Sequence, residues 1–210
     1  MLFLATCVGM VVYYQSEKKR IQDERTQRLM EAKEVGKPKL GGPFELIDHD
    51  GKPVTNRDYL GRFSLIYFGF CHCPDICPDE LDKIGEAVEL LDQDPESRDM
   101  VTPLFITCDP QRDDPATIKQ YLKEFHPKII GLTGTIDQVR KACKTFRVYF
   151  SKPPKVEEGQ DYLVDHSIFS YLMDSNGNFV DIYGKERTSA EMADSIKKYI
   201  KAFKSSSGGQ

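Results

Sequence analysis

The sequence has no excess of positive charge, no internal repeat and no apolar run of the length that crosses a bilayer. Its net charge is −4, and arginines and aromatic residues are not interleaved in any patch. A nucleic-acid-binding face needs clustered positive charge to neutralise phosphates. We therefore expect no nucleic-acid partner. The 210 residues, 40% hydrophobic and 30% charged, fit one globular domain with attachments.

The first 15 residues are uncharged and largely apolar, but they fall short of the roughly 20 residues that span a membrane. No basic stretch precedes them and no small-x-small cleavage site follows, which argues against a signal peptide. Tyr13 and Tyr14 stand at the polar boundary, as aromatic residues do at membrane interfaces. We interpret residues 1–15 as a membrane anchor, short or truncated, with a buried hydrophobic segment as the alternative.

Residues 16–37 are mostly charged and carry no sustained apolar stripe, which predicts a solvated helical spacer. Gly41-Gly42-Pro43 then interrupts the chain. We place the folded domain at residues 38–204, followed by a frayed tail at 205–210 that is rich in serine and glycine.

The domain alternates predicted strands and helices. Residues 63–70 form a nearly unbroken apolar run, typical of a central strand covered on both faces. Asp50-Gly51 and Asn176-Gly177 mark the turns of two hairpins. The predicted order is a hairpin (44–54), strand (63–70), helix (78–92), strand (104–108), helix (115–125), strand (129–130), helix (136–146), hairpin (168–183) and helix (188–203). This order predicts an α/β, thioredoxin-like fold, in a peroxiredoxin-like variant with an N-terminal hairpin.

Three of the six cysteines lie within residues 71–77. Pro78 suits the first position of a helix, which would make Cys77 its N-cap. Cys73 and Cys77 would then lie at or before a helix N-terminus, whose partial positive charge favours thiolates. A thiolate is both a redox nucleophile and a soft metal ligand, so this position suits two chemistries.

The spacing between Cys73 and Cys77 helps to distinguish redox chemistry from metal binding. Three residues separate Cys73 from Cys77, one more than in a redox Cys-x-x-Cys motif. The longer loop allows a disulfide, and it also lets two thiolates converge on a metal with room for a third ligand. Two thiolates and an imidazole suit Cu(I). A structural zinc site would need a fourth ligand, which Cys71 could supply. An inert disulfide or two packed thiols remains the plainer alternative.

His166 precedes a predicted late strand and is the candidate third ligand, although a lone histidine is more often structural. Asp165 could orient its imidazole or form a hydrogen bond at the start of the strand. We read His72 as structural or solvent-facing. Asp109 and Arg112 are expected to form a carboxylate–guanidinium pair beside the site, unless they cap a turn or a helix.

Four segments closely resemble the Sco family of cytochrome c oxidase assembly factors. They are Phe-Gly-Phe-Cys-His-Cys-Pro-Asp-Ile-Cys-Pro-Asp-Glu-Leu (68–81), Phe-Ile-Thr-Cys-Asp-Pro-Gln-Arg-Asp (105–113), Gly-Leu-Thr-Gly (131–134) and Asp-Tyr-Leu-Val-Asp-His-Ser (161–167). The resemblance runs from about residue 36 to the terminal helix. It implies copper bound through Cys73, Cys77 and His166. Cys71 departs from the family pattern, where a small hydroxyl residue is usual; it could pair with Cys73 on oxidation or add a ligand.

The resemblance also implies a function: a copper metallochaperone, not an enzyme, serving the binuclear copper site of cytochrome c oxidase subunit II. It would deliver copper, reduce that subunit's cysteines (a thiol–disulfide reductase activity), or both. Subunit II and other copper-relay proteins are the expected partners, with a homodimer as an option. The implied location is the mitochondrial inner membrane, single-pass, with the domain in the intermembrane space. Lys18-Lys19-Arg20 would favour the opposite orientation by the positive-inside tendency.

The main alternative is a membrane-tethered thiol–disulfide oxidoreductase that delivers no copper, with Cys73 and Cys77 as attacking and resolving thiols. His166 separates the two functions, because copper binding needs it and dithiol exchange does not. A redox or copper sensor that acts through a partner is a third hypothesis.

Overall fold

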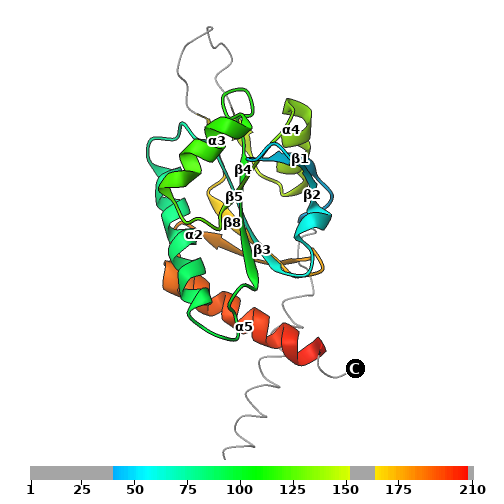
Figure 1. The fold of residues 1–210 in the computed structure, drawn as a ribbon, viewed down its shortest axis with the longest axis vertical. Helices are drawn as coiled ribbons and strands as arrows, with labels where there is room; N and C mark the ends of the chain where they lie inside the picture. Colours follow the sequence, from blue (N-terminus) through cyan, green and yellow to red (C-terminus); the bar gives the residue numbers. More distant parts are fainter. Residues whose placement is uncertain (1–39, 152–163, 208–210) are drawn as a thin grey trace, which may run out of the picture. The chain divides into compact units, whose positions relative to one another are not determined.

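The structure, a computed structural model, describes residues 40–151 and 164–207 (Figure 1). The predicted anchor at 1–15 and spacer at 16–37 lie outside the described residues. Within the described part of the chain, no helix combines the length and the apolar character that crossing a membrane requires.

A seven-stranded mixed sheet forms the centre of the domain, in the order β2-β1-β5-β4-β3-β8-β9. Its strands are β1 (Glu45–Asp48), β2 (Pro53–Thr55), β3 (Phe63–Gly69), β4 (Val101–Thr107), β5 (Ile130–Thr133), β8 (Phe169–Met173) and β9 (Phe179–Gly184). The three central strands β3, β4 and β5 are parallel, and an antiparallel hairpin flanks them on each side. All seven residues of β3 are buried, as its continuous apolar run predicted.

Helices cover both faces of this sheet. They are α2 (Ile76–Asp92), α3 (Pro115–Tyr121), α4 (Ile136–Thr145) and α5 (Ser189–Ser207), with short 3-10 turns η1 (Asn56–Tyr59) and η2 (Leu122–Glu124). In Figure 1, α2 and α3 lie on one side of the central strands and α4 on the other. Side chains at odd and even positions of β3 point to opposite faces of the sheet. Phe63 accordingly contacts Phe203 of α5 on one face, and Phe68 packs on Phe146 at the end of α4 on the other. The mixed sheet between helices fits the predicted thioredoxin-like fold.

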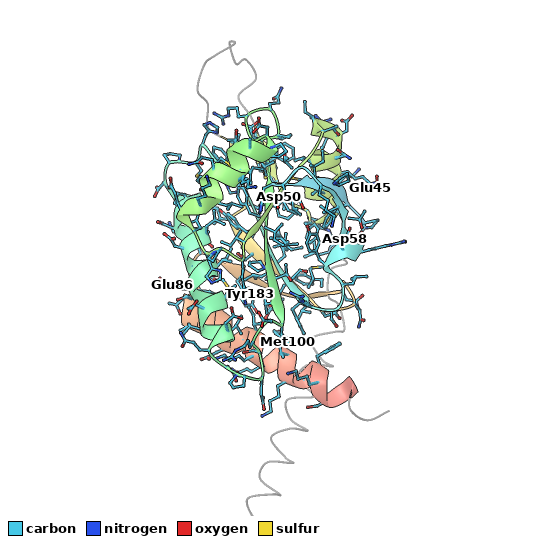
Figure 2. The ribbon with its side chains drawn as sticks, in the orientation of Figure 1. Glu45, Asp50, Asp58, Glu86, Met100 and Tyr183 are labelled. Atoms are coloured by element: carbon cyan, nitrogen blue, oxygen red, sulfur yellow. The ribbon has the colours of Figure 1, made fainter. Side chains whose placement is uncertain are left out.

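Side chains fill the space between the sheet and the helices (Figure 2). The labelled Tyr183 is only 2% exposed, while Asp58 and Glu86 lie at the surface. This separation of apolar interior from charged exterior is what the composition predicted for a single core.

The start of α2 corrects one prediction. The helix begins at Ile76, with Asp75 at the cap position, so Cys77 lies inside the first turn and is not the N-cap. Pro78 is still tolerated, because the first-turn N–H groups have no partner within the helix. The earlier start turns Cys77 inward, and its side chain is fully buried.

Two further differences concern the last third of the chain. A short strand β6 (Phe150–Ser151) pairs antiparallel with β7 (Asp165–His166), placing Phe150 opposite His166. This pair of strands is not predicted by the sequence, because strands of two residues are too short to show an alternating pattern. Helix α5 ends at Ser207, so it continues past residue 205, where the tail was predicted to begin.

Candidate metal centre

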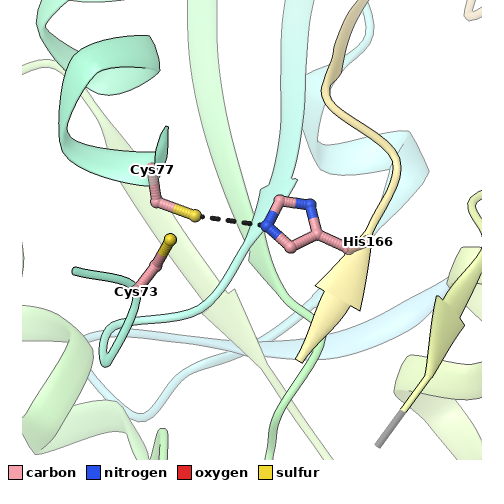
Figure 3. Close-up of side chains that lie close together, drawn as sticks. All are labelled: Cys73, Cys77 and His166. Carbon is pink, nitrogen blue, oxygen red and sulfur yellow. Dashed lines mark hydrogen bonds between the residues drawn. The ribbon is translucent and has the colours of Figure 1, made fainter. Parts of the chain in front are cut away.

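Three side chains from separate elements converge at one end of β3. Cys73 lies in the loop between β3 and α2, Cys77 in the first turn of α2, and His166 in β7. Their sulfur and nitrogen atoms all lie within 4.8 Å of one another. Figure 3 shows Cys77 facing the imidazole, with 3.3 Å between its Sγ and Nε2 of His166. Among the described residues, no other group of three or more such side chains meets this way.

The three side chains differ in depth. Cys77 is fully buried, whereas Cys73 and His166 are half-buried. The space for the Cys77 sulfur exists because Gly69 has no side chain: a Cβ there would lie 2.8 Å from Sγ of Cys77. The hydroxyl of Tyr67, on the same face of β3, donates a hydrogen bond to this sulfur at 3.5 Å.

The imidazole of His166 is held in one orientation. Its Nδ1 lies 3.1 Å from the carbonyl oxygen of Ser167. A carbonyl only accepts hydrogen bonds, so Nδ1 carries the proton and Nε2 presents its lone pair to Cys77. The ring also packs edge-on against Tyr67 and Phe70, at centroid distances of 6.1 and 5.8 Å. Asp165, expected to orient the ring, belongs to β7, but its side chain is outside the described part of the structure.

The two cysteines divide one proton between them. A hydrogen bond from Cys77 lowers the pKa of Cys73, assisted by backbone N–H groups of the loop. The same hydrogen bond raises the pKa of Cys77, and burial raises it further. Cys73 is therefore the thiolate and Cys77 the thiol at neutral pH. The charged, accessible sulfur is the nucleophile of the pair.

Cys71 does not join this group. Burial raises the pKa of its thiol, and the carboxylate of Asp113 raises it further. Its backbone N–H donates to the same carboxylate at 3.0 Å. Cys71, which could have added a ligand or paired with Cys73, is thus associated with Asp113, and none of the five cysteines that the structure describes forms a disulfide.

Asp113 supports the cysteine loop from the loop after β4. Its buried carboxylate accepts a hydrogen bond from the Thr107 hydroxyl at 2.6 Å, besides the one from the Cys71 backbone. The imidazole of His72 lies 3.3 Å away. Nearby, Arg112 pairs with Asp109 at 2.6 Å, which is one of the two alternatives that the sequence left open. Hydrogen bonds to Asp113 therefore connect the cysteine loop to the loop that follows β4.

Sequence reasoning missed Tyr67 and Gly69 as parts of the site. The available signal was positional: residues 67 and 69 share one face of a strand that leads into the cysteine loop. A buried tyrosine hydroxyl also needs a hydrogen-bond partner, which the apolar neighbours in the strand do not provide.

Known proteins of one family are similar to this chain over most of its length. The SCO1/SenC family model matches residues 32–201. Protein SCO1, mitochondrial, of Saccharomyces cerevisiae is 52% identical over 205 residues, covering 96% of this chain and 67% of that protein. Protein sco1 of Schizosaccharomyces pombe is 48% identical over 200 residues, covering 95% of this chain and 74% of that protein.

Solved structures are similar over the described domain. The crystal structure of yeast Sco1 with copper bound is 56% identical, with a TM-score of 0.74, covering 78% of this chain and 90% of that one. The crystal structure of Arabidopsis thaliana ScoI with copper bound is 46% identical, with a TM-score of 0.71, covering 77% of this chain and 98% of that one.

Proposed function

The chain belongs to the SCO1/SenC family, and from that premise we propose that it is a copper metallochaperone. One copper ion, favoured as Cu(I), would be held by Cys73, Cys77 and His166. The observation that carries the proposal is the convergence of two sulfurs and one imidazole nitrogen within 4.8 Å. Similar proteins from yeast and Arabidopsis have been solved with copper bound.

The donor set favours copper over zinc. Two thiolates and one imidazole make a soft, low-coordinate site, which Cu(I) accepts. A structural zinc ion requires four ligands, and the group found among the described residues offers three. The Nε2 lone pair of His166 is already directed toward the sulfurs, so this ligand needs no change of tautomer to bind.

The difference in depth supports transfer by ligand exchange. A thiol of a partner can reach the half-buried Cys73 and His166, whereas Cys77 holds the ion from inside the core. The ion would leave Cys77 last. We propose that the recipient is the binuclear copper site of cytochrome c oxidase subunit II. The protein would deliver copper to this site, reduce the cysteines of the site, or do both.

The proposed location is the mitochondrial inner membrane, with one membrane-spanning anchor and the domain in the intermembrane space. Support comes from the names of the Saccharomyces cerevisiae and human relatives, which include the word mitochondrial. Other copper-relay proteins and a second copy of the chain are further partners that we propose on family grounds.

An anaerobic Cu(I) titration of the reduced full chain, against a competing chromophoric chelator, tests the function. We expect one tightly bound copper in the wild type and a large loss of affinity in Cys77→Ala and His166→Ala. His126→Ala is the control, because this half-buried histidine lies near Glu89 and outside the group of three. If the wild type fails to compete, or if His166→Ala binds as the wild type does, the copper function is wrong.

A thiol–disulfide oxidoreductase is the second candidate. The observation that favours it is the pairing of a half-buried Cys73, whose pKa is lowered by its hydrogen bond from Cys77, with a buried thiol placed to resolve a mixed disulfide. Reduction of a disulfide-bonded peptide distinguishes the two. This activity should persist in His166→Ala if exchange is the function, whereas copper binding should not.

A further inference from the structure

We propose that Tyr67 is a positioning residue that shifts the Cys73–Cys77 pair toward the reduced dithiol. The inference rests on the proposed function, in which these two sulfurs must be reduced to bind copper. It goes beyond that function because a residue that binds no metal is assigned a part in setting the equilibrium between the dithiol and the disulfide of Cys73 and Cys77.

The Tyr67 hydroxyl is fixed in place by its surroundings. Tyr67 is fully buried in β3, which has β4 and β8 as its neighbours. Its ring stacks on Phe105 at a centroid distance of 6.5 Å and meets His166 edge-on at 6.1 Å. A side chain held on both sides by the sheet cannot follow a sulfur that moves. Its hydroxyl therefore acts as a stationary donor, 3.5 Å from Sγ of Cys77.

Oxidation of the pair by a small disulfide removes the acceptor that this donor uses. The S–S bond of the small disulfide breaks, and a bond forms between the sulfurs of Cys73 and Cys77. Two electrons and the Cys77 proton pass to the small molecule, which takes a second proton from solvent and leaves as two thiols. The new bond is about 2.0 Å long, so Cys77 must move toward Cys73, and a bridged sulfur accepts hydrogen bonds poorly.

The hydroxyl then loses its partner inside a dry core. A buried donor without an acceptor costs free energy, whereas the reduced state keeps the hydrogen bond. Tyr67 thus stabilises the dithiol relative to the disulfide. Tyr67→Phe removes the donor and keeps the ring. The stabilisation of the dithiol relative to the disulfide should therefore be lost, while the packing of the ring remains.

Tyr121 offers a matched control. Its hydroxyl is also buried, at the side of α3, but it has no hydrogen-bond partner among the described residues. The rings of Tyr121 and Phe105 lie 6.0 Å apart, so the control probes the same aromatic cluster. Tyr121→Phe removes a buried hydroxyl without removing a bond to sulfur.

The test equilibrates the full chain with reduced and oxidised glutathione under anaerobic conditions. Thiol alkylation and mass spectrometry of the peptide carrying Cys73 and Cys77 then give the oxidised fraction. A hydrogen bond of ordinary strength predicts that Tyr67→Phe shifts the equilibrium constant about fivefold toward the disulfide, lowering the reduction potential by about 20 mV. Tyr121→Phe should stay within about twofold of the wild type by the same reasoning. A shift in Tyr67→Phe no larger than in Tyr121→Phe, or a shift toward the dithiol, overturns the inference.

A second measurement keeps the inference testable if Tyr67→Phe does not fold, as judged by circular dichroism. In wild type with ¹³C at the tyrosine Cζ, the Tyr67 resonance should move more on oxidation than that of Tyr121; equal movement counts against the inference. Cu(I) titration of the same samples separates the two proposals. A wild type that binds no copper refutes only the metallochaperone. A copper-binding wild type without the Tyr67 effect refutes only this inference.

Discussion

Replacing Gly69 by alanine tests whether the space beside Cys77 is what lets its sulfur reach the site. A Cβ at position 69 would lie 2.8 Å from Sγ of Cys77 and 3.0 Å from ring carbons of Tyr67 and Phe105. Ordinary contacts between such atoms begin at about 3.5 Å. Both rings are held in an aromatic cluster, whereas the short Cys77 side chain can rotate, so the sulfur is the atom that moves, by roughly 0.7 Å.

The size of the effect follows from that displacement. Adding a methyl group to a packed core costs about 1–3 kcal/mol, so the free energy of unfolding of the apoprotein should fall by this amount. Metal–ligand distances hold to about 0.2 Å, so a sulfur displaced by several times this distance should weaken Cu(I) binding at least tenfold, on the order of 1.4 kcal/mol. Denaturant unfolding measures the first quantity and chelator competition the second.

Gly85→Ala is the matched control. Its Cβ would lie 2.9 Å from Cβ of His126, an equally close contact in the same helix as Cys77. Alanine also improves helix propensity by about 1 kcal/mol there, which offsets part of the clash. We expect Cu(I) affinity within about threefold of the wild type, since no proposed ligand is touched. Wild-type affinity in Gly69→Ala, or an equal loss in both variants, would refute the reasoning.

Two further predictions concern protons and the cysteine loop. The pKa of Cys73 is lowered by its hydrogen bond from Cys77, whose own pKa is raised, so copper binding should release one proton. Apparent Cu(I) affinity should therefore rise about tenfold per pH unit between about pH 7 and 8.5 in a competition titration; a slope of two, or none, would contradict this. Asp113→Ala should lower the free energy of unfolding by about 1–3 kcal/mol, because the Cys71 N–H and the Thr107 hydroxyl lose their acceptor. Asp113→Asn keeps one acceptor oxygen, so its free energy of unfolding in urea should fall by less than that of Asp113→Ala. Equal decreases in the two variants would count against the role of Asp113 as a hydrogen-bond acceptor.

Local patterns predicted most of the fold. The apolar run of β3 and the turn at Asn176-Gly177 act within a few residues, so the sequence displays them directly. The start of α2 was harder, because Pro78 is compatible with any position in a first turn. The two-residue shift decides whether Cys77 is a cap or a buried side chain, and sequence spacing cannot resolve it.

The grouping of the three proposed ligands was predictable from the sequence, and their surroundings were not. Cys73, Cys77 and His166 lie together as expected. Cys71 is only two residues from Cys73, yet its backbone N–H bonds to a carboxylate 42 residues further along the chain. Tyr67 is one of several aromatic residues in an apolar strand, and only the packed structure shows which sulfur its hydroxyl meets. Contacts of this kind depend on tertiary packing, which a single sequence does not display.

The distance along the chain between the proposed ligands determines when, during folding, the site becomes complete. Cys77 and His166 stand 89 residues apart, whereas Cys73 and Cys77 are only four residues apart in the sequence. Joining ends so distant in a flexible chain costs about 3 kcal/mol more than closing a loop of four residues. Until His166 has reached this position, an ion meets only the sulfurs of the cysteine segment at residues 71–77. We therefore expect full-strength copper binding only once β7 has paired with β6, so that a copper-loaded chain is one in which this late part of the domain has folded.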